Sequence, residues 1–521
     1  MILARETPRA SLAIWLPRPV SSMVEFMKFP PGPNRSNSAA EDSVPQIQLT
    51  TYVEFDMPNR EDIALMAHLT RRTGFGATRS ELETLVEQGY DETVEQLLSP
   101  EDQPPVDEYT LFRYHPGAET GSNLNHAQLR WLYGMVTTRR PLQEKVALFW
   151  HHVFATGQAK VESGRQMYAQ IELFREQGMG NFRELLLSVS KDPAMLYWLD
   201  NNENHKRAPN ENWGRELLEL FSLGAGNYTE KDVFECARAF TGWTMSPKIH
   251  WLLWGPHLWD FEYKPEDHDN GEKTFLGHTG NFNGEDIIDI ILQQPACARF
   301  IMRHLYNFFV ADEPQVPAWP IEEPRDLEAI TALEEVFVSS GYEMIPTLRF
   351  LLKSDFFKEA MYQKVKSPAE VVAGTLRLTG DLNGPDPRWG WVPSEPTYMG
   401  QALLDPPSVE GWHTGKEWIN SGSLINRVNF VSEKISNLDL PGVQDIIRRV
   451  GSTNGHGMSA DILVEGCLDQ MGPLEVKEQT RAELVAQVES GGPVAAGDED
   501  FPSRVGEVLS LIAGTREYQF G

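Results

Sequence analysis

The sequence predicts a mainly α-helical protein, in which a large multi-helix domain carries a small insertion that is an aromatic-rich β-hairpin or loop. From Glu61 onward, apolar residues recur at the spacing of one helix face. Strand-like alternation is convincing nowhere except within residues 245–278. With 521 residues, of which 41% are hydrophobic, the chain can bury a large core.

The helical periodicity can be followed along most of the chain. Helices are expected at residues 61–73, 79–98, 125–138, 141–155, 166–176, 181–190, 211–223, 230–240, 285–293, 296–310, 325–339, 343–353, 367–379, 396–404 and 423–436. After about residue 440, two or three more are expected, with the Gly/Pro/Ala-rich segment 491–498 as a loop between them.

The insertion within residues 245–278 contains WLLWGPHLWDFEYKPEDHDNGEKTFLG, which is rich in aromatic and turn-forming residues. Trp243, Trp251, Trp254 and Trp259 fall within a short stretch. Aromatic residues at this density close a core, or they line a cleft for a sugar, a ring or an amphipathic partner. The sequence leaves both alternatives open.

Three parts of the chain are expected. Residues 1–55, rich in Pro, Ser and Asn, are predicted to be a disordered leader or a targeting segment, in which Arg5 and Arg9 precede a short apolar stretch. Residues 56–436 form the helical domain, and residues 437–521 form a helical extension packed on it. A cytoplasmic location is expected, with export as the alternative.

Charge and cysteine content exclude several classes of protein. The formal net charge is −29, from 46 Lys plus Arg against 75 Asp plus Glu, which argues against a nucleic-acid partner. No apolar run approaches the roughly 18 residues that a membrane span needs. Cys236, Cys297 and Cys467 are too far apart for a disulfide framework or a CxxC metal site, and the first two are expected to be buried thiols.

The strongest local pattern is a helical hairpin at residues 210–243. Asn210 follows a proline and suits the start of a helix, and Gly224 to Gly226 suit its stop. Thr229 and Asp232 have the spacing of a capping box that begins the second helix.

One face of the first helix in this hairpin is polar. Asn212, Arg215, Glu216 and Glu219 line this face, and Glu211 precedes it by one turn. The face is either solvated, with Arg215 and Glu219 as an i,i+4 ion pair, or part of a buried polar network or site.

His151 and His152 follow one another on the expected helix at 141–155. Adjacent helical residues point about 100° apart, so the two rings cannot occupy the same ligand position. His151 is either a structural histidine that donates a buried hydrogen bond, or a ligand or acid/base group. The candidates for acid/base catalysis are His151, Glu211, Arg215, Glu216 and Glu219.

Oxygen-rich turns provide a second set of candidates. Asp267 to Gly271 and Asn281 to Asp286 place oxygen donors close together, as Ca²⁺ requires, but the spacing does not match an EF-hand. Turn formation and capping of a helix at Glu285 by Asn283 or Gly284 are the alternative.

A divalent metal such as Fe, Mn or Zn is a further hypothesis, because carboxylates on helices with a histidine from a neighbouring helix suit these ions. The candidate ligands are His151, Glu216, Glu219, His268 and Asp269. The chain lacks the Glu-x-x-His repeats of helical-bundle metal sites. It also lacks GxSxG, HExxH, Walker-loop and strand-flanked GxGxxG motifs.

The hairpin NENWGRELLELFSLGAGNYTEKDVFECARAFTGW resembles the bacterial family called domain of unknown function 1800, and further blocks in the same order extend the resemblance over roughly residues 60–435. These blocks are HLTRRTGFGAT at 68–78, FWHHVFATG at 149–157, NFRELLLSVSKDPAMLYWLDN at 181–201, HDNGEKTFLG at 268–277, QQPACARFIMRHLYNFFV at 293–310, KSPAEVVAGTLRLTG at 366–380 and DPPSVEGWHTGKEWINSGSLINRVNF at 405–430. The family has no settled activity.

The resemblance has three further implications. The family pattern favours His151 over His152 as the important histidine. The turn from Asp405 to Trp412 is interpreted as architecture that precedes the last family helix. Members of the family are often encoded beside a sulfatase-like family of unknown function 1501, which implies a protein partner from that family.

Two functional hypotheses follow. The favoured one is a helical binding or assembly protein with a buried polar network. The alternative is a metal-dependent or acid/base enzyme with a His/Glu/Asp site beside a Trp-rich lid. The two differ in whether the candidate side chains lie within reach of one another.

Overall fold

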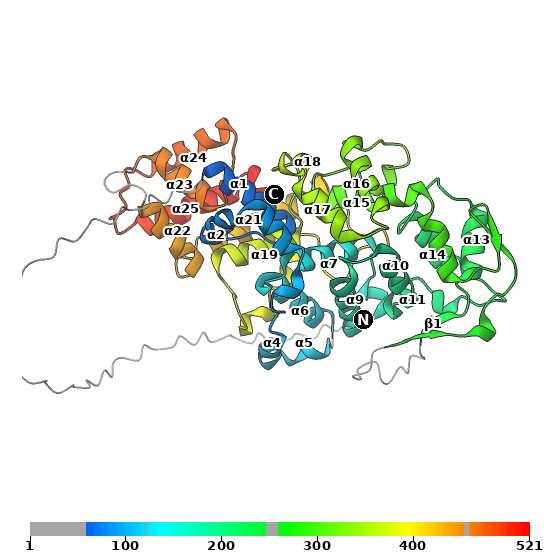
Figure 1. Ribbon diagram of the computed structural model, residues 1–521. Coiled ribbons are helices and arrows are strands. Elements are labelled where there is room, and N and C mark those ends of the chain that lie inside the picture. Colours follow the sequence, from blue (N-terminus) through cyan, green and yellow to red (C-terminus); the bar gives the residue numbers. More distant parts are fainter. Residues whose placement is uncertain (1–58, 122, 246–258, 453–457) are drawn as a thin grey trace, which may run out of the picture. The chain divides into compact units, whose positions relative to one another are not determined.

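Helices dominate the computed structural model, which describes residues 59–121, 123–245, 259–452 and 458–521 (Figure 1). These residues form 25 α-helices and two small antiparallel hairpins, which confirms the mainly α fold with a small β insertion. They belong to one unit, Met57–Gly521. The predicted leader lies outside the described residues. None of the described helices is long and apolar enough to cross a membrane.

The helices follow one another in this order. The first thirteen are α1 (Arg60–Thr73), α2 (Arg79–Gln88), α3 (Tyr90–Leu97), α4 (Glu108–Tyr114), α5 (Pro116–Thr120), α6 (Leu124–Thr137), α7 (Pro141–Val153), α8 (Gln158–Val161), α9 (Gly164–Gln177), α10 (Phe182–Ser190), α11 (Pro193–Trp198), α12 (Asn212–Glu219) and α13 (Glu230–Ala239). The others are α14 (Gly284–Leu292), α15 (Pro295–Phe309), α16 (Leu327–Ser339), α17 (Met344–Lys353), α18 (Asp355–Lys358), α19 (Pro368–Thr379), α20 (Ser394–Tyr398), α21 (Ser421–Ile435), α22 (Pro441–Ser452), α23 (Ala460–Gln470), α24 (Glu478–Ser490) and α25 (Phe501–Ala513).

Most differences from the predicted helices lie at breaks and in short elements. The segment 79–98 is two helices, because Gly89 adopts φ +100°, which favours glycine and ends α2. The segment 396–404 contributes only the end of the short helix α20. Four helices, rather than two or three, follow residue 440. The helices α4, α5, α8, α11 and α18 were not predicted, since they are too short to show periodicity.

The β insertion consists of two separate pairs of strands. β1 (Trp243–Met245) pairs with β2 (Phe261–Tyr263), and β3 (Lys273–Phe275) pairs with β4 (His278–Gly280), both antiparallel. Trp243 is buried, and its indole N–H donates to Asn283 Oδ1 at 3.0 Å, so this tryptophan closes a core. Trp251 and Trp254 lie outside the described residues.

Helix α7 lies at the centre of the core and carries both predicted histidines near its C-terminal end. Its Trp150 ring stacks on Phe154 and Phe182, with ring centroids 5.3 and 5.6 Å away. The Trp150 indole N–H donates to Gly178 O at 2.8 Å, so the polar atom of this buried ring is satisfied. The three cysteines are buried and free, which confirms the expectation for Cys236 and Cys297.

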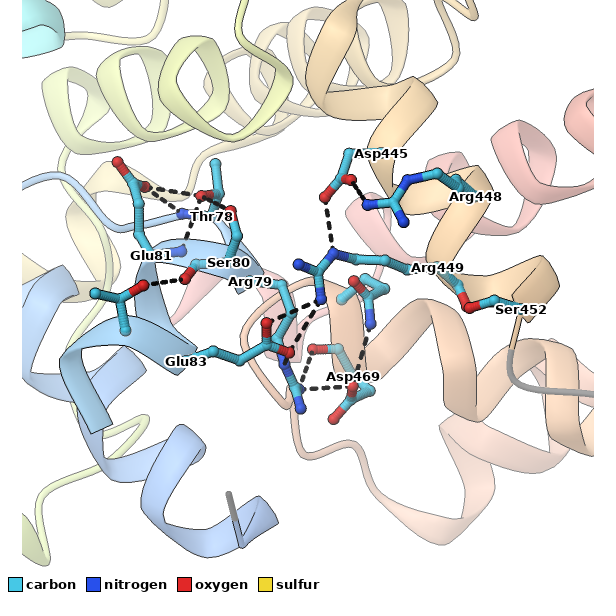
Figure 2. A network of polar contacts seen from close by, with 12 residues as sticks. Thr78, Arg79, Ser80, Glu81, Glu83, Asp445, Arg448, Arg449, Ser452 and Asp469 are labelled. Carbon is cyan, nitrogen blue, oxygen red and sulfur yellow. Dashed lines mark hydrogen bonds and ion pairs between the residues drawn. The ribbon is translucent and has the colours of Figure 1, made fainter. Parts of the chain in front are cut away.

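A network of ion pairs joins α2 to the helices after residue 440 (Figure 2). Arg79 contacts Glu83 at 3.1 Å and Asp469 at 2.6 Å. Arg449 contacts the same Glu83 at 3.0 Å and Asp445 at 2.8 Å. Glu83 therefore bridges arginines that lie far apart in the sequence and holds α22 against α2, while Arg79 holds α23 there through Asp469.

Replacing Glu83 by glutamine is expected to lower the free energy of unfolding by about 1 kcal/mol, because a partly buried carboxylate that serves two arginines is worth more than an exposed pair. Urea unfolding followed by circular dichroism measures this difference. Glu87→Gln on the same helix is the control, since Glu87 is exposed. Equal stability of the two variants would contradict the bridging role.

Candidate functional site

The helical hairpin of α12 and α13 forms as predicted, with local differences at its ends. Asn210 Oδ1 accepts the N–H of Asn212 at 3.0 Å, and the capping box of Thr229 and Asp232 is present. Helix α12 ends at Glu219, before the predicted glycine stop. The hairpin thus presents its polar face on the short helix α12, whose first N–H group is satisfied by Asn210.

The ion pairs on this face differ from the expected ones. Arg215 pairs with Glu230 of α13 at 2.7 Å and with Glu211 at 3.3 Å, rather than with Glu219. Glu219 instead accepts the hydroxyl of Tyr228 at 2.7 Å. Neither Glu216 nor Glu219 forms an ion pair with any described residue. Arg215 stabilises the hairpin and leaves two carboxylates of α12 without a paired cation.

One of these carboxylates, Glu219, lines a cleft with a volume of about 740 Å³, and Glu216 lies one turn before it on α12. Its walls come from residues 219–227 after α12, from the first part of α15, from residues 316–320 and from residues 408–410. Phe300 and Trp319 supply aromatic surface, and Glu219 and Glu410 supply carboxylates. The volume lies in the range of small-molecule sites, roughly 300–1,000 Å³.

The acidic wall is short of counterions. Burial, followed by the carboxylate of Glu219 and more weakly that of Glu410, raises the pKa of the half-buried Glu216 to about 7 against the opposing effect of Arg215. Glu410 Oε1 is buried and has no hydrogen-bond partner among the described residues. Glu219 and Glu410 therefore act on Glu216 as like charges, and Arg215 only partly offsets the combined effect of burial and repulsion.

We expect Glu216→Gln to raise the melting temperature at pH 8 and to leave it close to that of the wild type at pH 5. An acid whose pKa rises from 4.5 to about 7 on folding keeps its proton in the folded state between these values. Its contribution to stability is therefore present below about pH 4.5 and is lost as the pH rises to about 7. Thermal melts from pH 5 to 8 test this, with the exposed Glu335→Gln as control. A shift of equal size at both pH values would contradict it.

The arginines of the cleft are already neutralised. Arg303 pairs with the buried Glu313 at 2.8 Å, donates to Glu322 O at 3.0 Å and lies 4.6 Å from the centroid of the Trp319 ring. Arg299 pairs with Glu334 of α16 at 3.1 Å. The electrostatic field in the cleft is therefore set by its carboxylates.

His304 lies buried behind the aromatic wall, and sequence reasoning did not select it. Its ring is 4.7 Å from Phe300 and 4.5 Å from Trp319, centroid to centroid. Neither ring nitrogen has a hydrogen-bond partner within the part of the chain that the structure describes. Burial, then His152 and Arg303, hold the pKa of His304 well below its usual value, so the ring is neutral. The available signal was a histidine one turn after Phe300 on an apolar helix.

His151 serves the backbone of a distant loop. It is fully buried, and its Nε2 accepts the N–H of Leu404 at 3.2 Å, so the proton lies on Nδ1. Burial and then His152 lower the pKa of His151 to about 3. Leu404 has φ +62°, a conformation that costs a leucine energy and that this contact helps to hold. The structural interpretation was right in kind, but the histidine ring accepts this bond rather than donating it.

The same loop continues to the cleft and rests on His152. The ring of Trp412 stacks on that of His152 with centroids 6.5 Å apart, and its edge meets His151 at 5.4 Å. A Cβ atom at Gly411, where φ is +85°, would lie 2.7 Å from the carbonyl oxygen of His152. Glycine and tryptophan together let the loop approach α7 closely, and this approach places Glu410 at the cleft.

His268 and Asp269 are occupied elsewhere. His268 Nδ1 donates to Thr241 O at 2.9 Å. Asp269 pairs with Arg238 at 2.7 Å, and Arg238 lowers its pKa. No described hydrogen bond or ion pair joins these two residues to His151, Glu216 or Glu219.

A metal site among the five candidate ligands is not supported by their present contacts. In the described parts of the chain, no group of three or more His, Cys, Asp or Glu residues could hold a metal ion. His268 and Asp269 hold α13 against the β insertion, and His151 holds the loop at Leu404. The metal assignment stays a prediction.

The oxygen-rich turns form caps. Asn283 and Asp286 make a capping box at the start of α14, as the capping interpretation requires. Asp267 accepts from His205 Nδ1 at 2.5 Å, and this contact lowers the pKa of Asp267 against the effect of burial.

The sequence and the structure were compared with known proteins in three ways. A search of the curated proteins and a search of the solved structures each found no match. A family model described as "Protein of unknown function (DUF1800)" matches residues 68–520, which include every wall of the cleft. The chain therefore belongs to this family.

Proposed function

We propose that this protein binds a small organic cation in the cleft between α12, α15 and the loop that carries Glu410. The observation that carries the proposal is the buried oxygen of Glu410, which has no hydrogen-bond partner among the described residues. A buried carboxylate oxygen without a donor is costly, and a ligand ammonium group would supply the donor and the opposite charge.

The surroundings of Glu410 support a cation over an anion. Glu216 and Glu219 add two further carboxylates, whereas the arginines of the cleft already have acidic partners. A cation would relieve the mutual repulsion that raises the pKa of Glu216. Phe300 and Trp319 provide apolar surface for the hydrocarbon part of such a ligand.

The test compares cadaverine, an alkyl diamine, with the uncharged diol of equal length by isothermal titration calorimetry. Wild-type protein is expected to bind cadaverine and not the diol. Glu410→Gln is expected to weaken binding about tenfold, or about 1.4 kcal/mol. Glu335→Gln, which removes an exposed carboxylate, is expected to leave binding unchanged. Equal binding of diamine and diol would sink the proposal.

A second candidate function, acid/base catalysis in the same cleft, is favoured by one observation. The pKa of Glu216, near 7, suits a group that both gives and takes a proton at neutral pH. Glu216 would act as the acid/base group, with burial and then Glu219 and Glu410 keeping its pKa high. The test incubates a small-molecule extract of the source cells with wild-type protein or Glu216→Gln and compares the compounds by mass spectrometry. A compound consumed by the wild type alone supports catalysis, and identical profiles contradict it.

The hypothesis of a binding or assembly protein also includes assembly with a protein partner. A partner from the sulfatase-like family of unknown function 1501 rests on the resemblance alone. Purification from the native host tests it, because a stoichiometric partner supports assembly and a chain that purifies alone counts against it. Elemental analysis of the same preparation tests for a divalent metal.

A further inference from the structure

A small cavity formed by segments other than those of the cleft is lined by cationic side chains. Its volume is about 80 Å³, and its walls come from α1, from α19 and the residues just before it, and from segments 471–474 and 518–521. Arg71, Arg72 and Lys366 line it together with the carboxylate of Glu370. One water needs only about 10–15 Å³ of such volume, so the cavity has room for a larger polyatomic group.

Cations outnumber carboxylates around this cavity. The cationic side chains that act on one another here are Arg71, Arg72, Lys145, Lys364, Lys366 and Arg427. Two side-chain carboxylates, Glu370 and Asp312, lie among them. Each is engaged by a lysine, since Glu370 pairs with Lys145 and Asp312 pairs with Lys364 at 3.1 Å.

Among the described residues, the other four cations donate hydrogen bonds only to backbone carbonyls. Arg72 donates to Val310 O at 3.0 Å and Arg71 to Gly472 O at 3.2 Å. Lys366 donates to Tyr518 O at 2.8 Å, and Arg427 donates to Lys366 O at 2.9 Å. A carbonyl accepts a hydrogen bond but carries no net charge, so these four cations have no ion-pair partner among the described residues, and Glu370 and Asp312 act on them only from beyond contact distance.

Several guanidinium nitrogens of these arginines are unpartnered. Arg71 Nε and Nη2, Arg72 Nε, and Arg427 Nε and Nη2 are buried without a hydrogen-bond partner in the described chain. Arg72 is 2% exposed and Arg427 is 0% exposed, so solvent does not reach them. Burial lowers the pKa of Arg72 and of Arg427 to about 10, and burial and then Arg71 lower that of Lys366 to about 7.

We infer that this cavity binds a tetrahedral oxyanion, phosphate or sulfate, between Arg71, Arg72 and Lys366. A guanidinium presents its N–H groups as a planar fork that matches the oxygens of such an anion, and the anion supplies the missing negative charge. Arg427 supports the site through its contact with the backbone of Lys366 and through its own positive charge. This site is independent of the cleft and of the ligand proposed there.

The test uses the full chain without residues appended after Gly521, because Gly521 lines the cavity. Melting temperatures are measured in phosphate, sulfate and chloride at matched ionic strength. Phosphate or sulfate is expected to raise the melting temperature by roughly 2 °C more than chloride, since an anion held by the folded state alone stabilises it. The oxyanion with the larger shift identifies the preferred ligand. Ion chromatography after acid denaturation detects an anion that stays bound through purification.

The melting temperature of the Lys366→Met variant distinguishes oxyanion binding from a general loss of stability. Removing one cation relieves repulsion, so this variant is expected to melt no lower than wild type in chloride and to lose most of the extra shift in phosphate or sulfate. Arg71→Met, at a partly exposed position, is the second variant and is expected to lose the same shift. Lys231→Met, at an exposed position on α13, is the control and is expected to keep it.

Two results would overturn the inference. One is a wild-type protein that releases neither anion on denaturation and responds equally to all three salts. The other is an oxyanion shift that persists unchanged in both Lys366→Met and Arg71→Met.

Discussion

Glu370→Gln is expected to lower the free energy of unfolding by about 3–5 kcal/mol, because it removes one partner of a buried ion pair and leaves the other charge uncompensated. Lys145 is 0% exposed, and besides Glu370 its hydrogen-bond acceptors among the described residues are only two backbone carbonyls, those of Arg71 and Gly74. Urea unfolding at pH 7 measures the loss. Glu359→Gln, at an exposed position, is the control and is expected to cost little.

The loss caused by Glu370→Gln also has a defined pH dependence. Burial opposes ionisation of Glu370, but Lys145 and Lys364 outweigh it and lower its pKa from 4.5 to about 2. A carboxylate with a lowered pKa contributes stability that is present above its unfolded pKa and is lost as the pH falls through its folded pKa. The gap between wild type and variant should therefore narrow between about pH 4.5 and pH 2. A gap that is constant across this window would contradict the assignment of the charge.

Arg303→Met is expected to destabilise the protein by about 3–5 kcal/mol and to disturb the aromatic wall of the cleft. The side chains of Arg303 and Glu313 are 6% and 0% exposed, so the substitution leaves a buried carboxylate with the backbone N–H of Arg325 as its remaining donor. The guanidinium beside the Trp319 ring is lost at the same time. Thermal and urea unfolding give the stability, and tryptophan fluorescence reports on the wall.

Two controls separate the buried charge from the loss of a side chain. Arg299→Met breaks the more exposed pair with Glu334 and is expected to cost at most about 1 kcal/mol. The double change Arg303→Met with Glu313→Leu removes both buried charges and is expected to recover most of the stability. A double variant that is as unstable as the single one would show that packing, rather than charge, causes the effect.

Features that depend on neighbouring residues could be predicted from the sequence. The capping box of Thr229 and Asp232 and the cap at Asn283 involve residues three positions apart, so their spacing alone predicts them. Three of the four segments that line the cleft also lie within the blocks that carry the family resemblance, and residues 316–320 lie outside them. The place of a residue in such a block, however, does not indicate which residue it contacts in the folded chain.

Features that join distant segments could not be predicted. Arg215 pairs with Glu230 because the turn of the hairpin brings α13 beside α12, and the i,i+4 rule predicts only the local alternative. Glu410 and His304 belong to different elements that meet only in the folded chain, so no spacing marks them as neighbours. The sequence around Asp269 suggests oxygen atoms that are free to bind a cation. In the fold Asp269 pairs with Arg238, and the sequence does not show this pair because Arg238 lies on another element.

His151 Nε2 cannot accept the Leu404 N–H and bind a metal ion or a proton at the same time. Nε2 has a single lone pair in the plane of the ring, and the Leu404 N–H occupies it. A metal ion or a proton that took this lone pair would release the backbone of Leu404, six residues before Glu410. Chemistry at His151 would therefore be thermodynamically linked to a rearrangement of the loop that supplies the acidic wall of the cleft.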